Sequence, residues 1–256
     1  MGQMLVRQVA ETAGTELAGG TELSGDAALG ADVAVIAGLQ AAGINITDDA
    51  SAVIAAADVA IEFSLPAATA AHVELAAASG TPLVIGTTGH DGSQMGLIEA
   101  AAQKSAIVKA MNFSAGVNVL FALTERLAAT LDEDFDIEIF EMHHKHKVDA
   151  PSGTAIGLGQ AAARGRGVVL DDKAVRGRDG ISEERQPGDI GFASLRGGDV
   201  VGEHSVVFAG AGERVELHHK AASRVIFAAG AVRAALWLEG KEPGLYDMLD
   251  VLGLGD

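Results

Sequence analysis

The sequence contains no cysteine, which excludes disulfide bonds, thiolate metal sites and a cysteine nucleophile. Aromatic residues make up only 4% of the 256 residues, so a core has to be built mainly from Ala, Val, Leu and Ile. Basic residues are also few, and the formal net charge of −17 argues against a nucleic-acid partner. No uncharged apolar run reaches ~18 residues, and the N-terminus lacks the pattern of a secretory signal. These absences predict a soluble, cytoplasmic protein that does not enter a membrane.

Short apolar runs alternate with helix-like segments in the first part of the chain. Residues 59–63, 82–85 and 106–108 resemble buried strands, with a further short strand near 17–20 and helices at 2–12, 67–79 and 95–104. The β-α-β-α-β order predicts an α/β fold with a doubly wound parallel sheet. Ligands bind at the carboxyl ends of such strands, which here lead into the loops at 63–66, 86–89 and 110–114.

The pattern changes after about residue 114. A helix is expected at 117–131, an alternating strand at 135–141, and another helix after Ser152. Short runs at 191–196, 203–209 and 214–219 are separated by Gly-rich turns, and a strong helix is expected at 225–238. This part of the chain therefore predicts a second, α+β domain with an antiparallel or mixed sheet.

Five consecutive residues that can carry positive charge, His143-His144-Lys145-His146-Lys147, stand out in this acidic chain. Like charges repel when they are crowded, so the cluster favours an anionic ligand that receives protons. The sequence Pro-Ser-Gly-Thr at 151–154 then opens a helix, whose first N–H groups form a ready anion site. Together they predict a pocket for a carboxylate or phosphate.

Two other interpretations of the cluster stay open at this point. A regular strand would place Glu141, His143, Lys145 and Lys147 on one face and the residues between them on the other. A zinc site needs three converging ligands, whereas the adjacent His143 and His144 would point to opposite faces. A solvated basic edge of a sheet is the second alternative.

These stretches together resemble the 4-hydroxy-tetrahydrodipicolinate reductase family, long called dihydrodipicolinate reductase. The resemblance rests on residues 141–155, and it is supported by residues 84–89, 112–118, 196–204 and 231–237. Their order and spacing agree with the family along essentially the whole chain. The resemblance implies an oxidoreductase of lysine and diaminopimelate biosynthesis, in which NADH or NADPH delivers hydride to a cyclic, unsaturated dicarboxylate.

The resemblance also implies residue roles. His143 corresponds to the family's proton donor, and Lys147 to its second proton donor or charge stabiliser. His144 and the backbone of Gly153 and Thr154 correspond to substrate-binding positions. The positions that correspond to the cofactor site are Met1, Glu22, Gly86, Thr87, Thr88, Ala110, Met111, Asn112 and Phe113. No metal site is implied.

The family's architecture implies a dinucleotide-binding domain at residues 1–114 with 224–256. It also implies a substrate-binding and tetramerisation domain at 115–223, in a homotetramer. Three histidines on expected strands, His204, His218 and His219, are interpreted as structural. Arg224 and Arg233 are interpreted in the same way, although Arg224 lies near the expected domain hinge and could contact the cofactor.

The chain departs from the family at its start. The family begins with a strand and a Gly-rich loop, whereas Met1-Gly2-Gln3 resembles the tail of that loop, so roughly fifteen residues are expected to be missing. The apolar run at 33–38 is not followed by a GxGxxG pattern and is not interpreted as a substitute. A start codon placed too late would explain the departure. The alternative is a truncated, non-catalytic protein that still binds a dicarboxylate.

A second departure concerns the choice of nucleotide. Glu22 occupies the position of the acidic residue that holds the adenosine ribose hydroxyls. Family members that accept NADPH well carry arginines where this chain has Leu23 and Leu65. Without a guanidinium, a 2′-phosphate beside Glu22 would be poorly compensated, which predicts a preference for NADH over NADPH. The competing interpretation is that another basic residue, such as Arg7, covers the phosphate.

Overall fold

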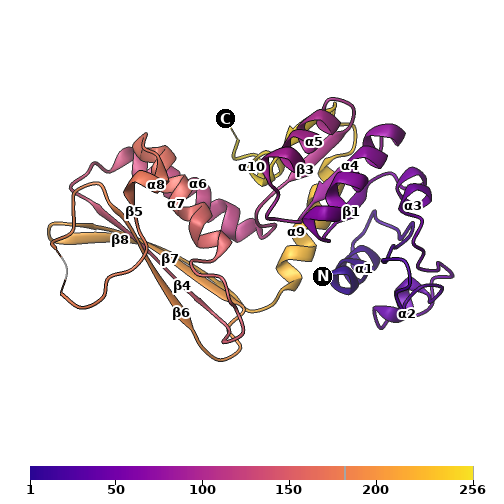
Figure 1. Cartoon of the computed structure of the whole chain (residues 1–256), viewed down its shortest axis with the longest axis horizontal. Coiled ribbons are helices and arrows are strands. Elements are labelled where there is room, and N and C mark those ends of the chain that lie inside the picture. The colour runs from indigo at the N-terminus through magenta and orange to yellow at the C-terminus, as the bar shows by residue number, and fades with distance from the viewer. Residues whose placement is uncertain (182, 256) are drawn as a thin grey trace. The chain divides into compact units, whose positions relative to one another are not determined.

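The computed structural model describes residues 1–181 and 183–255, which divide into two compact units. Unit 1 comprises residues 1–114 and the segment that begins at Val225, and unit 2 comprises Ala115–Arg224. In Figure 1, unit 1 is coloured indigo to magenta together with the yellow C-terminal segment. This division assigns Arg224 to unit 2. Each unit is described by itself below.

Unit 1 contains a four-stranded parallel sheet. In spatial order its strands are β1 (Ala60–Glu62), β2 (Leu83–Ile85), β3 (Ala106–Lys109) and β9 (Gly244–Tyr246). Helix α4 (Pro66–Ser79) connects β1 to β2, and α5 (Gly92–Ala102) connects β2 to β3. Helix α4 ends at Gly80, whose φ of 73° suits glycine rather than a residue with a side chain. The expected alternation and parallel sheet are confirmed.

Helices cover both faces of this sheet, so the doubly wound arrangement is confirmed as well. Val84 and Val108 pack into a core with residues of α1 (Gly2–Glu11), α9 (Val225–Trp237) and α10 (Met248–Leu252). Leu83, Ile85 and Ile107 point to the opposite face, into a core with α4 and α5. Each of these side chains is at most 1% exposed, and burying one contributes about 1.5–3 kcal/mol.

One expected strand of unit 1 is wrong. Residues 17–20 form no strand, and only a single bridge joins Thr21 to Thr47. The reason is that a strand needs a neighbour along its whole length, and here pairing is limited to this bridge. Two short helices that the sequence did not predict follow, α2 (Val33–Ile36) and α3 (Ala50–Ala56), capped by Asp32 and Asp49.

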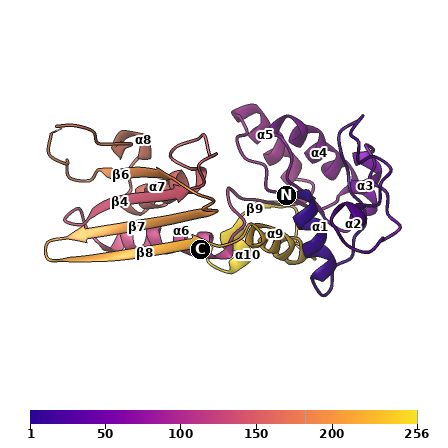
Figure 2. The ribbon, with the colours of Figure 1, turned by 90° about the horizontal axis from the view of Figure 1, so that it is seen from below.

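Unit 2 contains a five-stranded sheet that is mixed, one of the two kinds expected, and its short strand β5 was not predicted. Its strands are β4 (Asp136–His143), β5 (Ala174–Val175), β6 (Ile190–Arg196), β7 (Gly202–Gly210) and β8 (Glu213–Ala221), in the spatial order β5-β6-β4-β7-β8. β4 is parallel to β6 and antiparallel to β7. Both long helices, α6 (Ala115–Thr130) and α7 (Gly153–Arg166), lie on one face of the sheet (Figure 2), while α8 (Leu170–Lys173) is short.

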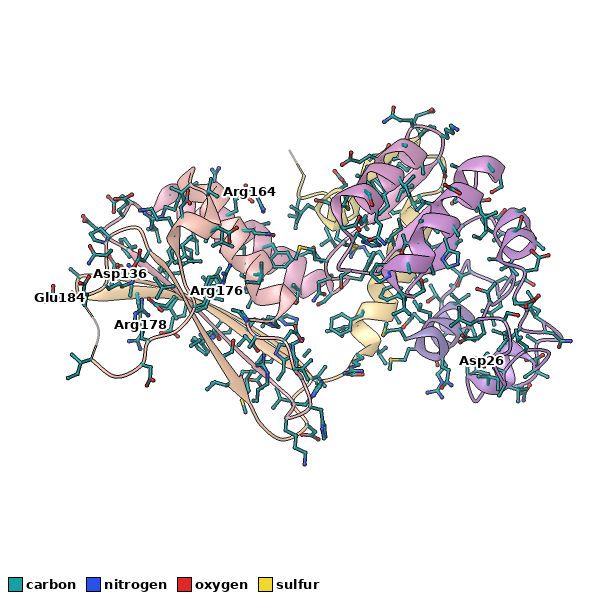
Figure 3. The ribbon with its side chains drawn as sticks, viewed as in Figure 1. Asp26, Asp136, Arg164, Arg176, Arg178 and Glu184 are labelled. Atoms are coloured by element: carbon teal, nitrogen blue, oxygen red, sulfur yellow. The ribbon has the colours of Figure 1, made fainter. Side chains whose placement is uncertain are left out.

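The two helices of unit 2 pack closely where α7 carries glycine. A Cβ atom at Gly165 of α7 would lie 2.3 Å from the carbonyl oxygen of Glu125 in α6, so a larger residue would separate the helices. Arg178, labelled in Figure 3, lies in the segment that follows β5. Arg178 donates two hydrogen bonds of 3.0 Å to Glu138 on β4. No helix among the described residues is long and apolar enough to cross a membrane.

Candidate functional site

In unit 1 the candidate nucleotide residues line one edge of the parallel sheet. The loops that leave β1 and β2 are tied together, because the N–H of Ser64 donates to Thr87 Oγ1 at 2.8 Å. The N–H of Gly86 donates to the carbonyl of Glu62 at 2.8 Å, which extends the pairing of these strands. Thr87 is buried, whereas Thr88 is exposed. This edge is where a parallel α/β sheet binds its ligand.

The loop after β3 carries the remaining candidates, Ala110 to Phe113. Asn112 Oδ1 accepts a hydrogen bond of 2.8 Å from the N–H of Ser114 and so closes a turn. Phe113 is buried, and its ring centroid lies 5.6 Å from that of Phe63 in the loop after β1. A Cβ at Gly230 of α9 would lie 1.7 Å from the Phe113 carbonyl oxygen, so this glycine fixes the loop against α9. Met111, in the same loop, is 46% exposed.

Two nucleotide candidates lie on other elements of unit 1. Met1 immediately precedes α1, a helix that has neither a side-chain cap nor an acidic residue in its first turn. Glu22 follows the bridge at Thr21, and its side chain is exposed. An uncapped helix start attracts anions such as a pyrophosphate, and an exposed carboxylate accepts hydrogen bonds from ribose hydroxyls. The residues present therefore fit a dinucleotide.

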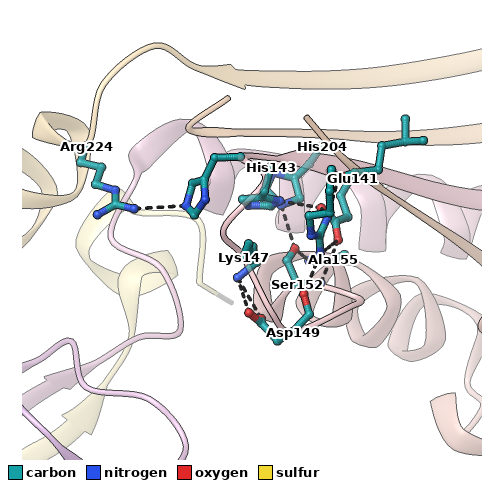
Figure 4. A network of polar contacts seen from close by, with 11 residues as sticks. Glu141, His143, Lys147, Asp149, Ser152, Ala155, His204 and Arg224 are labelled. Carbon is teal, nitrogen blue, oxygen red and sulfur yellow. Dashed lines mark hydrogen bonds and ion pairs between the residues drawn. The ribbon is translucent and has the colours of Figure 1, made fainter. Parts of the chain in front are cut away.

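In unit 2 the pairing register of the sheet brings the polar site together. Glu141 and His143 lie two residues apart on β4 and are both buried on the face toward α7, as the alternation predicted. Arg196 of β6 pairs with His143, and His204 of β7 pairs with Glu141. Figure 4 shows Glu141, His143 and His204 around Ser152 at the start of α7, and the pairing of β6 with β4 brings Arg196 to the same place.

Glu141 connects these side chains. Its Oε2 lies 2.5 Å from His143 Nδ1, and Arg196 donates to both carboxylate oxygens at 2.8 and 2.9 Å. Burial alone would raise the pKa of Glu141, but the hydrogen bonds from Arg196 and His143 hold that pKa below its usual value. An ionised carboxylate can only accept, so His143 Nδ1 carries a proton. The other ring nitrogen, Nε2, is therefore the one free to exchange a proton with a ligand.

His143 is kept partly desolvated. Burial lowers its pKa below the usual value, and the neighbouring Glu141 carboxylate offsets only part of that effect. A Cβ at Gly202 would lie 3.0 Å from His143 Nε2, so the missing side chain leaves room beside that nitrogen. His143 thus has a buried, oriented imidazole whose Nε2 can take up a proton and pass it to a ligand.

The strand does not continue to Lys147, which corrects the expected face assignment. β4 ends at His143, and the N–H of His144 donates to the carbonyl of Val200 at 2.7 Å. The N–H of Lys147 then donates back to the carbonyl of His144 at 3.1 Å, which closes a turn. Lys147 Nζ is held by both oxygens of Asp149 at 2.8 Å. A turn, rather than strand alternation, therefore places Lys147.

The predicted helix after the cluster is confirmed as α7. Ser152 is its cap, and Ser152 Oγ accepts from the N–H of Ala155 at 3.2 Å. The first helical residues are Gly153, which is exposed, and Thr154, which is half-buried, and no acidic residue lies in the first turn. The positive end of the α7 dipole is thus available to an anion.

His144 is half-buried and directly follows β4. Its Nε2 is 3.4 Å from a guanidinium nitrogen of Arg224 (Figure 4), and its ring centroid is 6.2 Å from that of His146. Because Arg224 carries a permanent charge, this pair adds to the attraction of the site for anions. Among the described residues, no group of three His, Asp or Glu side chains is arranged to hold a metal ion.

Sequence reasoning assigned no role to Glu141, Ser152 or Arg196 and interpreted His204 as structural. His204 is buried, its Nε2 lies 3.1 Å from Ser152 Oγ, and its ring centroid is 5.1 Å from that of His143. Burial, reinforced by the charge of His143, lowers the pKa of His204 to about 3, so it is neutral near pH 7. The only signal in the sequence was the stretch 196–204, which contains both Arg196 and His204.

Comparisons with known proteins match the whole chain. The family model for the N-terminus of dihydrodipicolinate reductase matches residues 1–113, and the model for its C-terminus matches residues 116–252. A protein of Ruegeria sp. (strain TM1040) named 4-hydroxy-tetrahydrodipicolinate reductase is 54% identical over 99% of this chain and 94% of its own length. A protein of the same name from Rhodopseudomonas palustris (strain BisB5) is 54% identical over 100% of this chain and 94% of its own length.

The fold agrees with solved structures. The dipicolinate-bound dihydrodipicolinate reductase from Paenisporosarcina sp. TG-14 superposes with a TM-score of 0.75 at 24% identity, covering 97% of this chain and 94% of that one. A probable dehydrogenase from Thermotoga maritima gives a TM-score of 0.62 at 9% identity, covering 98% of this chain and 89% of that one. At these identities the likeness shows the fold, which is an α/β fold with a second sheet.

Proposed function

The chain belongs to the dihydrodipicolinate reductase family, and on that premise we propose that it reduces 4-hydroxy-tetrahydrodipicolinate to tetrahydrodipicolinate with a pyridine nucleotide. This activity would serve lysine and diaminopimelate biosynthesis in the cytoplasm. The observation that carries the proposal is the 54% identity, over 99% of the chain, to a protein of that name. The same full-length match disfavours the non-catalytic alternative.

Product analysis tests this proposal. With NADH deuterated at the transferred position of C4, the product should contain one deuterium and should have lost one oxygen relative to the substrate. Mass spectrometry of the product measures both changes. A product without deuterium, or the absence of product from a folded protein, would contradict the proposal.

The chemistry assigned to the chain is proton delivery and charge stabilisation. A bound reduced nicotinamide supplies a hydride, which is two electrons and one hydrogen, to the conjugated imine of the substrate. The ring atom that receives the electron pair must take up a proton, and the hydroxylated substrate also loses water. His143 would donate from Nε2 after taking up a second proton there from solvent, since its Nδ1–H is committed to Glu141. Lys147 would supply a second proton or a stabilising charge.

The substrate is proposed to bind through its carboxylates. The start of α7, at Gly153 and Thr154, offers backbone N–H groups and the positive end of a helix dipole. His144, with Arg224 beside it, offers a second contact for an anion. The neighbour from Paenisporosarcina is described as dipicolinate-bound, which supports a cyclic dicarboxylate as the ligand of this fold.

The nucleotide is proposed to bind in unit 1. Gly86, Thr87 and Thr88 and the Ala110–Phe113 loop would contact the nicotinamide side, with Met1 near the pyrophosphate and Glu22 on the adenosine ribose. The contacts between Ser64 and Thr87 and between Phe63 and Phe113 hold these loops in place before any ligand arrives. Preformed loops lower the entropy cost of binding.

We expect NADH to be preferred over NADPH. Leu23 and Leu65 are 72% and 66% exposed and cannot neutralise a 2′-phosphate beside Glu22. Arg7 was the competing candidate, but its Nε donates to the Ala37 carbonyl, which supports the preference. The measurement is kcat/KM for both nucleotides, with Leu23→Arg expected to raise the value for NADPH and Leu97→Arg, at another exposed leucine of unit 1, as the control. Equal or higher kcat/KM with NADPH in the unaltered chain would contradict this expectation.

We also expect a homotetramer formed through the open face of the unit 2 sheet. On that face Phe140 of β4 and Leu195 of β6 are 39% and 52% exposed, whereas both long helices cover the other face (Figure 2). Exposed apolar side chains on a sheet face mark an association surface. Light scattering should therefore report a mass of four chains, and Leu195→Glu should reduce it. A monomeric mass at micromolar concentration would contradict this assembly.

A further inference from the structure

Arg196, the last residue of β6, contacts both segments that carry the proposed proton donors. Its guanidinium donates two parallel hydrogen bonds to Glu141, the partner of His143. It also donates to the backbone carbonyl of Asp149 at 2.6 Å, and Asp149 holds Lys147. A fourth hydrogen bond, of 2.6 Å, goes to the carbonyl of Leu195. The Arg196 side chain therefore joins the strand that carries His143 to the turn that carries Lys147. Neither the family comparison nor the sequence assigned Arg196 a part in the reaction.

We propose that Arg196 is a positioning residue that aligns His143 and Lys147 for the same substrate. The inference rests on the proposed reductase function, because it assumes that both residues act on one ligand. Arg196 does not itself serve as a substrate ligand. A guanidinium has five N–H donors, and four of the five are already used by acceptors within unit 2.

Arg196 acts on His143 through its two hydrogen bonds to Glu141. The Glu141 side chain is only 1% exposed, and a buried carboxylate stays ionised only when it is paired. If Arg196 is removed, Glu141 loses its only cationic hydrogen-bond partner, and the hydrogen bonds from His143, from the Ser194 side chain and from the N–H of Ser152 remain. We expect Glu141 then to take up a proton. A protonated carboxyl no longer forces the Nδ1-protonated form of His143, so Nε2 is no longer reserved for the substrate.

Arg196 acts on Lys147 through its hydrogen bond to the backbone carbonyl of Asp149. The ion pair between Lys147 and Asp149 is not rigid by itself, because the Asp149 side chain is 57% exposed and solvent screens it. The segment is anchored at its backbone, by the hydrogen bond from Arg196 to the Asp149 carbonyl. Loss of this bond would free the turn that carries Lys147. One substitution is therefore expected to misplace both proton donors.

A lysine cannot replace Arg196 in this role. The two bonds to Glu141 and the bond to the Asp149 carbonyl need a planar fork with fixed directions, whereas an ammonium group is a point charge. Arg164 supplies a matched control in the same unit (Figure 3). It also donates two hydrogen bonds to one carboxylate, that of Glu125, but it is 54% exposed and lies at the other end of α7.

The experiment compares Arg196→Ala, Arg196→Lys and Arg164→Ala. We expect Arg196→Ala to lower kcat about 100-fold, the lower end of what misplaced acid–base groups cost, with little change in substrate KM. Added guanidinium ion should restore part of the kcat of Arg196→Ala. Arg196→Lys should stay impaired, and Arg164→Ala should match the unaltered protein. In a double-mutant cycle with Glu141→Gln, the fold loss of kcat in the double variant should be smaller than the product of the two single fold losses. The reason is that Arg196 and Glu141 both act through His143.

The tautomer of His143, measured by NMR, tests the role of Arg196 without any need for turnover. In protein labelled with ¹⁵N-histidine, the His143 signals should show a proton on Nδ1, and Arg196→Ala should shift them toward the other tautomer. If the unaltered protein has no reductase activity, the tautomer spectra still decide whether Arg196 positions His143. An unchanged kcat, a loss confined to KM, or an unchanged tautomer in a folded Arg196→Ala or Arg196→Lys variant would overturn the inference.

Discussion

Replacing Lys147 with alanine is expected to lower kcat roughly 10²- to 10⁴-fold, the usual loss when a positioned acid is removed. The Lys147 Nζ is held by both carboxylate oxygens of Asp149, so the charge has a defined position that an alanine cannot supply. Nucleotide binding should survive, since the candidate nucleotide residues belong to unit 1 and Lys147 belongs to unit 2. Steady-state kinetics and calorimetric titration with NADH measure these two properties.

Lys145→Ala is the matched control for this prediction. Lys145 lies in the same turn, but its side chain is exposed and its N–H donates to the carbonyl of Gly198. Its removal should leave kcat almost unchanged. If Lys147→Ala keeps full turnover, Lys147 has no part in the mechanism. If both lysine variants lose activity equally, the site depends on the total positive charge of the cluster rather than on a positioned donor.

Acidification is expected to destabilise the protein through His204. Its pKa is about 3 in the folded state against an ordinary value of 6.5, so the unfolded chain binds the proton first. The stabilisation from neutral His204 is therefore fully present above about pH 6.5 and is lost progressively as the pH falls toward 3. The difference between the two pKa values corresponds to at most about 5 kcal/mol of unfolding free energy. About 2 kcal/mol of it should disappear between about pH 6.5 and pH 5.

Urea unfolding at fixed protein concentration measures this effect. His204→Gln keeps a polar group that can bond to Ser152 but cannot titrate, so its unfolding free energy should fall less between pH 6.5 and pH 5. His146→Gln, which replaces an exposed imidazole in the same unit, should follow the unaltered protein. Identical pH dependence in His204→Gln and the unaltered chain would show that His204 is not the group responsible.

The sequence predicted the elements that local patterns determine. Ser152 before a helix-like run identified the start of α7, and alternation on β4 placed Glu141 and His143 on one face. Lys147 was placed wrongly because pairing of His144 and Lys145 with residues 198–200 ends the strand, and no periodicity signals that change. The expected strand at 17–20 failed for the same kind of reason, since strand formation depends on a neighbour that local pattern does not specify.

Contacts between distant residues account for what the sequence could not predict. Arg196 and Glu141 are 55 positions apart, and Ser152 and His204 are 52 positions apart. Only the register of β4 with β6 and β7 brings them together. The stretch 196–204 indicated family membership, but the role of Arg196 follows from its hydrogen bonds, which a single sequence does not contain.

This chain is expected to act as a pyridine-nucleotide-dependent reductase. The most direct test follows the absorbance of NADH as the 256-residue chain acts on freshly generated 4-hydroxy-tetrahydrodipicolinate. We expect NADH oxidation that depends on this substrate, falls sharply in Lys147→Ala and stays unchanged in Lys145→Ala. A correctly folded chain that oxidises neither NADH nor NADPH in the presence of this substrate would show that it is not this reductase.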